Sequence, residues 1–174
     1  MTDPGGPARP SRLAALARAV RERRVSAEEL VADALGRIEA ARSLGAIVAI
    51  RPEGALAEAR AWTSGSFSGR PVGRMAGLPL LVKDLEAAAG LATTFGSLPW
   101  ADARPAERDG VAASRLREAD AILLGKTNTP EFALSGHTSN RLFGPTRNPC
   151  QPASALEGLR TKKSRPLGID RSRS

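Results

Sequence analysis

The sequence is poor in the residue types on which several classes of function depend. Its 174 residues include one cysteine (Cys150), one histidine (His137) and no tyrosine, and only 3% are aromatic. A single cysteine excludes an internal disulfide and fits a reducing compartment. No apolar run approaches the roughly 20 residues that span a bilayer, and residues 1–10 lack the residue order of a signal peptide. We therefore expect a cytoplasmic protein without a membrane partner.

The scarcity of histidine and cysteine also argues against two kinds of catalysis. His137 lies in a polar segment, with nothing else in the sequence to support a His-dependent triad. The sequence around Cys150 lacks the pattern of a cysteine with a catalytic basic partner, so Cys150 is a poor candidate nucleophile. Ligand residues do not cluster at metal-binding spacings, and we expect no metal site.

The net charge of +8 invites a nucleic-acid interpretation, but its distribution does not favour one. Residues 1–150 carry 20 Lys+Arg against 16 Asp+Glu, whereas the last 24 residues carry 6 against 2. Half of the excess thus lies in a short terminal segment that has no aromatic residue to stack on bases. A nucleic-acid partner is accordingly not expected.

Lysine usage is more informative than net charge. Residues 1–150 contain 18 arginines but only two lysines, Lys83 and Lys126. Arginine stays charged at any working pH, whereas a buried lysine can lose its proton. A lysine in an arginine-rich background is therefore a candidate for chemistry that arginine cannot perform, although chance explains the bias equally well.

The pattern along the chain predicts a helical region followed by an α/β region. Helices are expected from Ser11 to about Arg24, from Ser26 to about Ala41, and over residues 53–62. Ser26 and Glu29 have the spacing of a capping box. We expect residues 1–10 to be disordered, 11–69 to form the helical region, 70–149 to form the first part of an α/β core, and 150–174 to be a divergent, disordered basic tail.

Two short apolar runs in the second region predict buried strands, at residues 78–82 and 121–124, with a helix over 110–119 between them. This order predicts a mostly parallel or mixed sheet. Residues 46–50 suit either a strand or a buried turn, and Thr129-Pro130-Glu131 has the composition of a helix start. Lys83 and Lys126 each fall near the carboxyl end of a predicted strand, where open sheets bind ligands.

Several separated motifs, in order, resemble the amidase signature family. They are residues 77–84, 89–97, 125–133 and, together with Asn140, residues 143–149; the predicted helix at 25–41 is also similar to the family's N-terminal helix. The resemblance is continuous from about residue 12 to 149, which makes it specific. It implies an incomplete amidase-signature α/β fold and hydrolysis of carboxamide C–N bonds in small-molecule substrates without a cofactor.

The resemblance also implies a Ser–Ser–Lys triad in which Lys83 is the general base, acting through a bridging serine on a nucleophilic serine. A lysine base must be neutral when it accepts a proton, so we expect Lys83 to be buried or semi-buried after the strand at 78–82. Lys126 is interpreted as structural, with a smaller chance of contacting substrate. Asp84 is expected to support the local fold, and Trp62 and Phe67 to be packing residues.

The sequence departs from the family after Asn148-Pro149. There the family continues into Gly-Gly-Ser-Ser-Gly-Gly-Ser, which contains the bridging serine, whereas this chain has no Gly-Gly-Ser. Ser154 lies near the expected place but lacks the flanking glycines. Three hypotheses follow: an inactive product that ends before the serines, one half of a split amidase completed by a second chain, or a non-catalytic interaction module with a basic tail.

Overall fold

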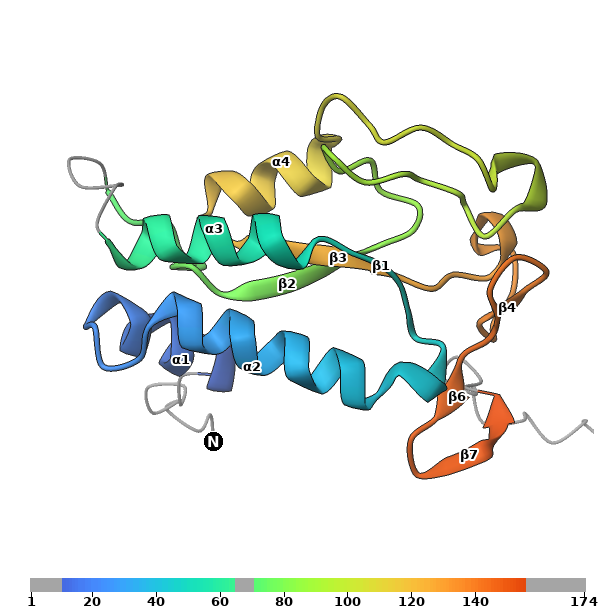
Figure 1. The fold of residues 1–174 in the computed structure, drawn as a ribbon, viewed down its shortest axis with the longest axis horizontal. Helices are drawn as coiled ribbons and strands as arrows, with labels where there is room; N and C mark the ends of the chain where they lie inside the picture. The colour runs from blue at the N-terminus through green and yellow to red at the C-terminus, as the bar shows by residue number, and fades with distance from the viewer. Residues whose placement is uncertain (1–10, 65–70, 156–174) are drawn as a thin grey trace, which may run out of the picture.

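The structure, a computed structural model, describes residues 11–64 and 71–155, and for 151–155 the backbone alone (Figure 1). The predictions of disorder at 1–10 and from 156 onward, and of packing by Phe67, lie outside the described residues. No helix within the described ranges is long and apolar enough to cross a bilayer.

Three helices precede or flank the first strand. They are α1 (Arg12–Arg21), α2 (Ala27–Ala40) and α3 (Pro52–Thr63), with the 3-10 turn η1 (Arg42–Leu44) and strand β1 (Ile47–Ile50) between the last two. The capping box predicted at the start of α2 is confirmed, because the Ser26 side chain accepts from the Glu29 N–H while the Glu29 carboxylate accepts from the Ser26 N–H. These two bonds satisfy N–H groups that a helix N-terminus leaves free.

The central sheet has three strands in the order β1-β3-β2. Strands β2 (Pro79–Lys83) and β3 (Ile122–Thr127) pair in parallel, and their connection contains the 3-10 turn η2 (Leu98–Trp100) and helix α4 (Val111–Glu118). Strand β1 pairs antiparallel with the other edge of β3. Both predicted strands and the mixed α/β sheet are confirmed, and residues 46–50, for which two interpretations were open, include a strand.

The sheet is covered on both faces (Figure 1). On one face, α1, α2 and α3 form an apolar core with β2 and β3, which includes Val31, Ala55, Leu78 and Leu124. On the other face, α4 and the loop after β2 form a second core around Val82, Leu91 and Leu123. Two covered faces explain why the strands are short apolar runs rather than alternating ones.

A half-buried ion network joins α3 to α4 and to the sheet. Glu58 accepts from Arg51 at 2.7 Å and from Arg117 at 3.0 Å, and Arg117 also contacts Asp109 at 3.0 Å. Arg51 in addition donates to the carbonyl of Leu123 in β3. Because these charges are shielded from water, they connect the layers more effectively than the exposed pairs on α1 and α2.

After β3 the chain forms a 3-10 turn, η3 (Glu131–Ala133), and four short strands, β4 (Ser139–Asn140), β5 (Gly144–Pro145), β6 (Arg147–Asn148) and β7 (Gln151–Ala155). Strand β4 pairs with β5, and β6 pairs with β7. The segment expected to be a disordered tail from residue 150 therefore includes a paired strand at its start.

The helix predicted at Thr129-Pro130-Glu131 is wrong. Only the three residues of η3 are helical in type, and Thr129 does not cap them: its hydroxyl donates to the Pro130 carbonyl instead. Phe132 and Ala133 have φ of 47° and 61°, in the left-handed region, so an α-helix cannot continue through them.

Candidate active site

Lys83 is the last residue of β2, paired with Thr127 at the end of β3. Its side chain is exposed, although Val82 before it and Asp84 after it are buried. The prediction that Lys83 is buried or semi-buried is therefore wrong. Side chains alternate between faces along a strand, and Val82 packs in the core on the α4 side of the sheet, toward which Asp84 also points. Lys83 consequently points to the side that carries α1 to α3, and at this end of β2 the described residues leave its side chain exposed.

The lysine that is buried is Lys126, in the register position next to Val82. Its side chain has no solvent exposure, and Nζ donates to Thr93 Oγ1 at 2.5 Å and lies 3.5 Å from Asp84 Oδ1. An unpaired buried ammonium is very costly, and these two contacts compensate part of that cost. The hypothesis that Lys126 is structural agrees with this placement, because no substrate reaches a side chain with 0% exposure.

Asp84 is the hub of this buried cluster. Its Oδ1 accepts from the Thr94 N–H at 3.1 Å, and its Oδ2 accepts from the Thr94 hydroxyl. Its backbone N–H donates to the Thr127 carbonyl at 3.0 Å, and its carbonyl accepts from the Phe95 N–H at 3.1 Å. The interpretation that Asp84 supports the local fold fits these contacts.

Burial lowers the pKa of Lys126, because the low-polarity interior disfavours its charged form. The carboxylate of Asp84 opposes this effect through its charge and its contact with Nζ, and the charge of Glu86 adds to that opposition. Since desolvation is the largest influence, the net direction is downward.

The loop that follows β2 includes residues 89–97, which are mostly small or carry hydroxyl groups. Ser97 is buried, and its hydroxyl donates to the Glu131 carboxylate of η3 at 2.5 Å. The ring of Phe95 stacks on Phe132, at 5.7 Å between centroids, and meets Trp100 edge to face at 5.5 Å. The Phe132 N–H also donates to the Phe95 carbonyl. These contacts fix the loop against η3, beside the strand end that carries Lys83.

Two asparagines organise the chain beyond β3. The amide nitrogen of Asn128 donates to the carbonyls of Gly45 and Gly144 and to Thr146 Oγ1, at 3.1 to 3.2 Å. That of Asn140 donates to Asn128 Oδ1 and to the Thr129 carbonyl, while Asn140 Oδ1 accepts two backbone N–H groups. Both asparagines lie in the motifs noted from the sequence, and the structure brings those motifs together.

The other candidate residues lie elsewhere. His137 Nδ1 is 3.2 Å from Ser135 Oγ on an exposed loop, a contact between residues two apart in sequence, and Cys150 is exposed. Among the described residues no group of three or more His, Cys, Asp and Glu side chains is arranged to bind a metal ion.

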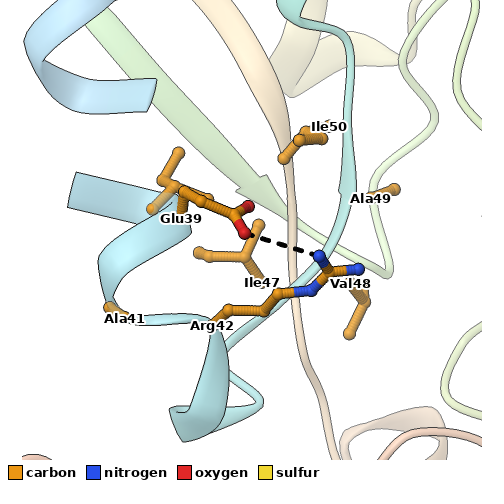
Figure 2. Close-up of a pocket in the computed structure, with 8 residues that line it drawn as sticks. Glu39, Ala41, Arg42, Ile47, Val48, Ala49 and Ile50 are labelled. Carbon is orange, nitrogen blue, oxygen red and sulfur yellow. Dashed lines mark hydrogen bonds and ion pairs between the residues drawn. The ribbon is translucent and has the colours of Figure 1, made fainter. Parts of the chain in front are cut away.

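A surface pocket lies between the C-terminal end of α2 and β1 (Figure 2). It is lined by Ile38, Ala41 and the residues of β1, and by Glu39 and Arg42, which face each other at 3.5 Å. Neither lysine lines it. Glu39 and Arg42 are 68% and 81% exposed, so this pocket offers no desolvated group for chemistry.

These motifs, and the fold that brings them together, are those of an amidase-type hydrolase. Residues 29–156 match the Amidase family, and the chain belongs to that family. Its relatives include a glutamyl-tRNA(Gln) amidotransferase subunit of Nitratidesulfovibrio vulgaris (strain DP4), 43% identical over 148 residues, which are 84% of this chain and 29% of that protein. The acylamidase of Rhodococcus erythropolis is 37% identical over 144 residues, 82% of this chain and 30% of that protein.

Solved structures agree with the sequence relatives. A bacterial aryl acylamidase of the amidase signature family superposes with a TM-score of 0.77 at 32% identity, over 88% of this chain and 32% of that one. The peptide amidase of Stenotrophomonas maltophilia superposes with a TM-score of 0.70 at 34% identity, over 82% and 31%. The chain thus spans about a third of the length of the family members it matches.

Sequence reasoning missed one member of the buried cluster. It included Thr93 only within the motif at residues 89–97, yet Thr93 is the hydrogen-bond acceptor for Lys126 and also donates to the Glu86 carbonyl at 3.4 Å. A pair of threonines about ten residues after Asp84 was the available signal, but it did not indicate which lysine they would face.

Proposed function

We propose that this chain supplies the lysine base for amide C–N bond hydrolysis of the amidase-signature type. One observation carries the proposal. Lys83 lies in the segment that resembles the family's lysine motif, and it also lies at the carboxyl end of the parallel pair β2 and β3. That edge is where ligands bind in sheets of this kind. No cofactor is needed, because the reaction is a sequence of proton transfers and acyl transfers.

In this scheme Nζ of Lys83 accepts a proton from a bridging serine, which in turn accepts one from the nucleophilic serine. The nucleophile's oxygen then attacks the amide carbon, and the C–N bond breaks as the departing amine takes up the proton. Water then attacks the carbonyl carbon of the acyl-serine ester, and the ester C–O bond breaks, which releases the carboxylic acid and returns a proton to the serine. Arginine cannot replace Lys83 in the first step, because its guanidinium does not release a proton at working pH.

The serines are the part of this scheme that the chain's sequence does not match. No Gly-Gly-Ser stretch occurs among the 174 residues, and we propose that the chain alone is inactive. The alternative is that a separate chain supplies the serines. The amidotransferase relative is named as a subunit, and this name is the only support for a second chain. The substrate is proposed as a small-molecule amide, and a cytoplasmic location stays a prediction.

A chimera tests the proposal. Residues 12–149 would replace the matching segment of the Rhodococcus erythropolis acylamidase, and the rest of that protein, beyond the 30% that this chain matches, would be kept. The family resemblance implies that the kept part supplies the serines. Hydrolysis of a simple anilide by the chimera supports the proposal. A folded chimera without activity, beside an active parent enzyme, would show that this segment no longer serves the reaction and would favour the interaction-module hypothesis.

A further inference from the structure

We propose that Lys126 is a positioning residue for Lys83: through Asp84 and Thr93 it fixes the end of β2 and the loop after it onto β3. The importance of that position for hydrolysis rests on the proposed function of Lys83. The positioning itself is a property of this chain and depends only on its own contacts.

The junction between the two strands is the first point that Lys126 holds. Lys83 pairs with Thr127, and the next N–H, that of Asp84, donates to the Thr127 carbonyl at 3.0 Å. These are the last backbone contacts of the parallel pair, and strand ends open more readily than strand centres. The ion pair of Lys126 with Asp84, at 3.5 Å, lies directly beside this junction and ties the two strand ends together through their side chains.

The loop that follows β2 is the second part of the chain that Lys126 holds in place. Asp84 binds it by accepting two hydrogen bonds from Thr94, and its carbonyl accepts a third from Phe95. Lys126 binds the same loop one residue earlier, through the Thr93 hydroxyl. A single buried ammonium therefore contacts both the strand end and the loop, so it couples their positions.

The two lysines point in different directions. Lys126 shares the face of Val82, on the α4 side of the sheet, whereas Lys83 shares the register position of Thr127 on the other face. As long as Asp84 stays in the cluster, strand alternation directs Lys83 away from it, to the exposed position at the end of β2. If the Asp84 side chain were released, only the backbone bonds of Asp84 to Thr127 and Phe95 would still hold this residue in place.

The chemistry of the site explains why lysine suits this position. The cluster has space for one compact ammonium, with an acceptor on each of two elements, and Lys126 is fully buried there. A guanidinium has five donors in a rigid plane and would bring unsatisfied N–H groups into the interior. Residues 1–150 contain 18 arginines and two lysines, and the geometry of this cluster explains why one of the two lysines, Lys126, is not an arginine.

Local hydrogen exchange tests the proposal on the chain itself. The amides of Asp84, Thr94 and Phe95 report on the cluster, and those of Arg51 and Ile122, which donate to Leu124 and Leu78, report on the rest of the sheet. Thr93→Val removes the hydroxyl and keeps the shape, whereas Thr93→Ser keeps the hydroxyl. Lys126→Met removes the charge.

We expect Thr93→Val to accelerate exchange at the three cluster amides by about tenfold or more, with less than about threefold change at the two reference amides, because the opening is local. Lys126→Met also lowers the global stability, so in this variant all five amides should exchange faster, and the three cluster amides should accelerate more than the two reference amides. Thr93→Ser should stay near the wild-type pattern. Equal acceleration at all five amides in Thr93→Val would mean that the contact between Lys126 and Thr93 contributes only to global stability, and it would overturn the proposal. Unchanged exchange at the cluster amides would overturn it as well.

This outcome is independent of the proposed function. An inactive chimera together with local acceleration in Thr93→Val would refute hydrolysis and leave the positioning role intact. If Lys126→Met does not fold, Thr93→Val and Thr93→Ser still decide the question, because neither leaves a buried charge without its ionic partner.

Discussion

Lys126 Nζ lies 3.5 Å from Asp84 Oδ1, and both side chains are buried between β2, β3 and the loop after β2. We predict that Lys126→Met destabilises the chain by about 3–5 kcal/mol, because the substitution leaves Asp84 as an uncompensated buried charge. The double variant Lys126→Met with Asp84→Asn should recover part of the loss. Urea unfolding of the four proteins gives the coupling energy, and additive losses would contradict the ion pair.

The same lysine predicts a pH dependence. A group whose pKa is lower in the folded than in the unfolded state binds fewer protons when folded, so between the two pKa values stability rises with pH. For Lys126 this window lies below the ordinary lysine value of about 10.4. The groups that act on its charge are Asp84 and Glu86.

The measurement is the free energy of unfolding of the wild type and of Lys126→Met over the neutral to alkaline range. As pH rises through this window, the free energy of unfolding of the wild type should increase relative to that of Lys126→Met, because the methionine side chain of the variant does not titrate. A difference that moves the opposite way would mean that the folded state raises the pKa of Lys126.

Gly125 should tolerate no side chain. A Cβ at this position would lie 2.0 Å from the Ala49 carbonyl oxygen of β1. Gly125→Ala should therefore cost about 3 kcal/mol or more, because the clash is with backbone that must shift and break the β1–β3 pairing. Gly136→Ala is the matched control, since no atom lies within 4 Å of its Cβ position. Thermal unfolding with equal midpoints for the two variants would contradict the close strand approach.

The bridging carboxylate of Glu58 should contribute more than an exposed one. Glu58→Gln weakens two contacts, to Arg51 and Arg117, in a half-buried setting, and we expect a loss of about 1–2 kcal/mol. Glu39→Gln weakens only an exposed contact to Arg42 and should change stability by less than about 0.5 kcal/mol. Equal effects in chemical denaturation would show that the network between α3 and α4 is as solvent-screened as a surface pair.

Much of the backbone follows from local pattern. The capping box at Ser26 and Glu29 and the two apolar runs that become β2 and β3 depend on near neighbours, and all were predicted. The failed helix at Thr129 shows the limit of such reasoning. Its composition suits a helix start, but Thr129 is drawn into the interior and the left-handed φ of Phe132 is set by contacts with Phe95, 37 positions earlier.

The two lysines show the same limit at the candidate site. Sequence pattern predicted where each lysine stands relative to its strand, and the motif resemblance distinguished Lys83 from Lys126. Which lysine is buried depends on the face of the sheet to which each side chain points. Lys126 is buried against Thr93 and Asp84, which precede it by more than 30 positions in the sequence. A shift in the β2–β3 register after Leu80 contributes to this placement.

Isolated, the 174-residue chain should not hydrolyse amides. No Gly-Gly-Ser stretch is present, and a lysine base without the family's serines has no nucleophile to activate. The measurement is product formation from simple amides and anilides by the purified chain. Turnover that persists through purification and disappears in Lys83→Ala would mean that another residue, such as Ser154, acts as the nucleophile.

The role of Lys83 as the base is tested most directly by amide hydrolysis in the chimera with residues 12–149 of this chain. Lys83→Ala should lower kcat by about 10²- to 10⁴-fold, the range typical for loss of general acid–base catalysis. Lys83→Arg should restore none of it, since arginine does not act as a base. Arg42→Ala, which removes a cation that is 81% exposed, should leave kcat unchanged. A Lys83→Ala chimera that folds and retains the kcat of its parent would contradict the assignment of Lys83 as the base.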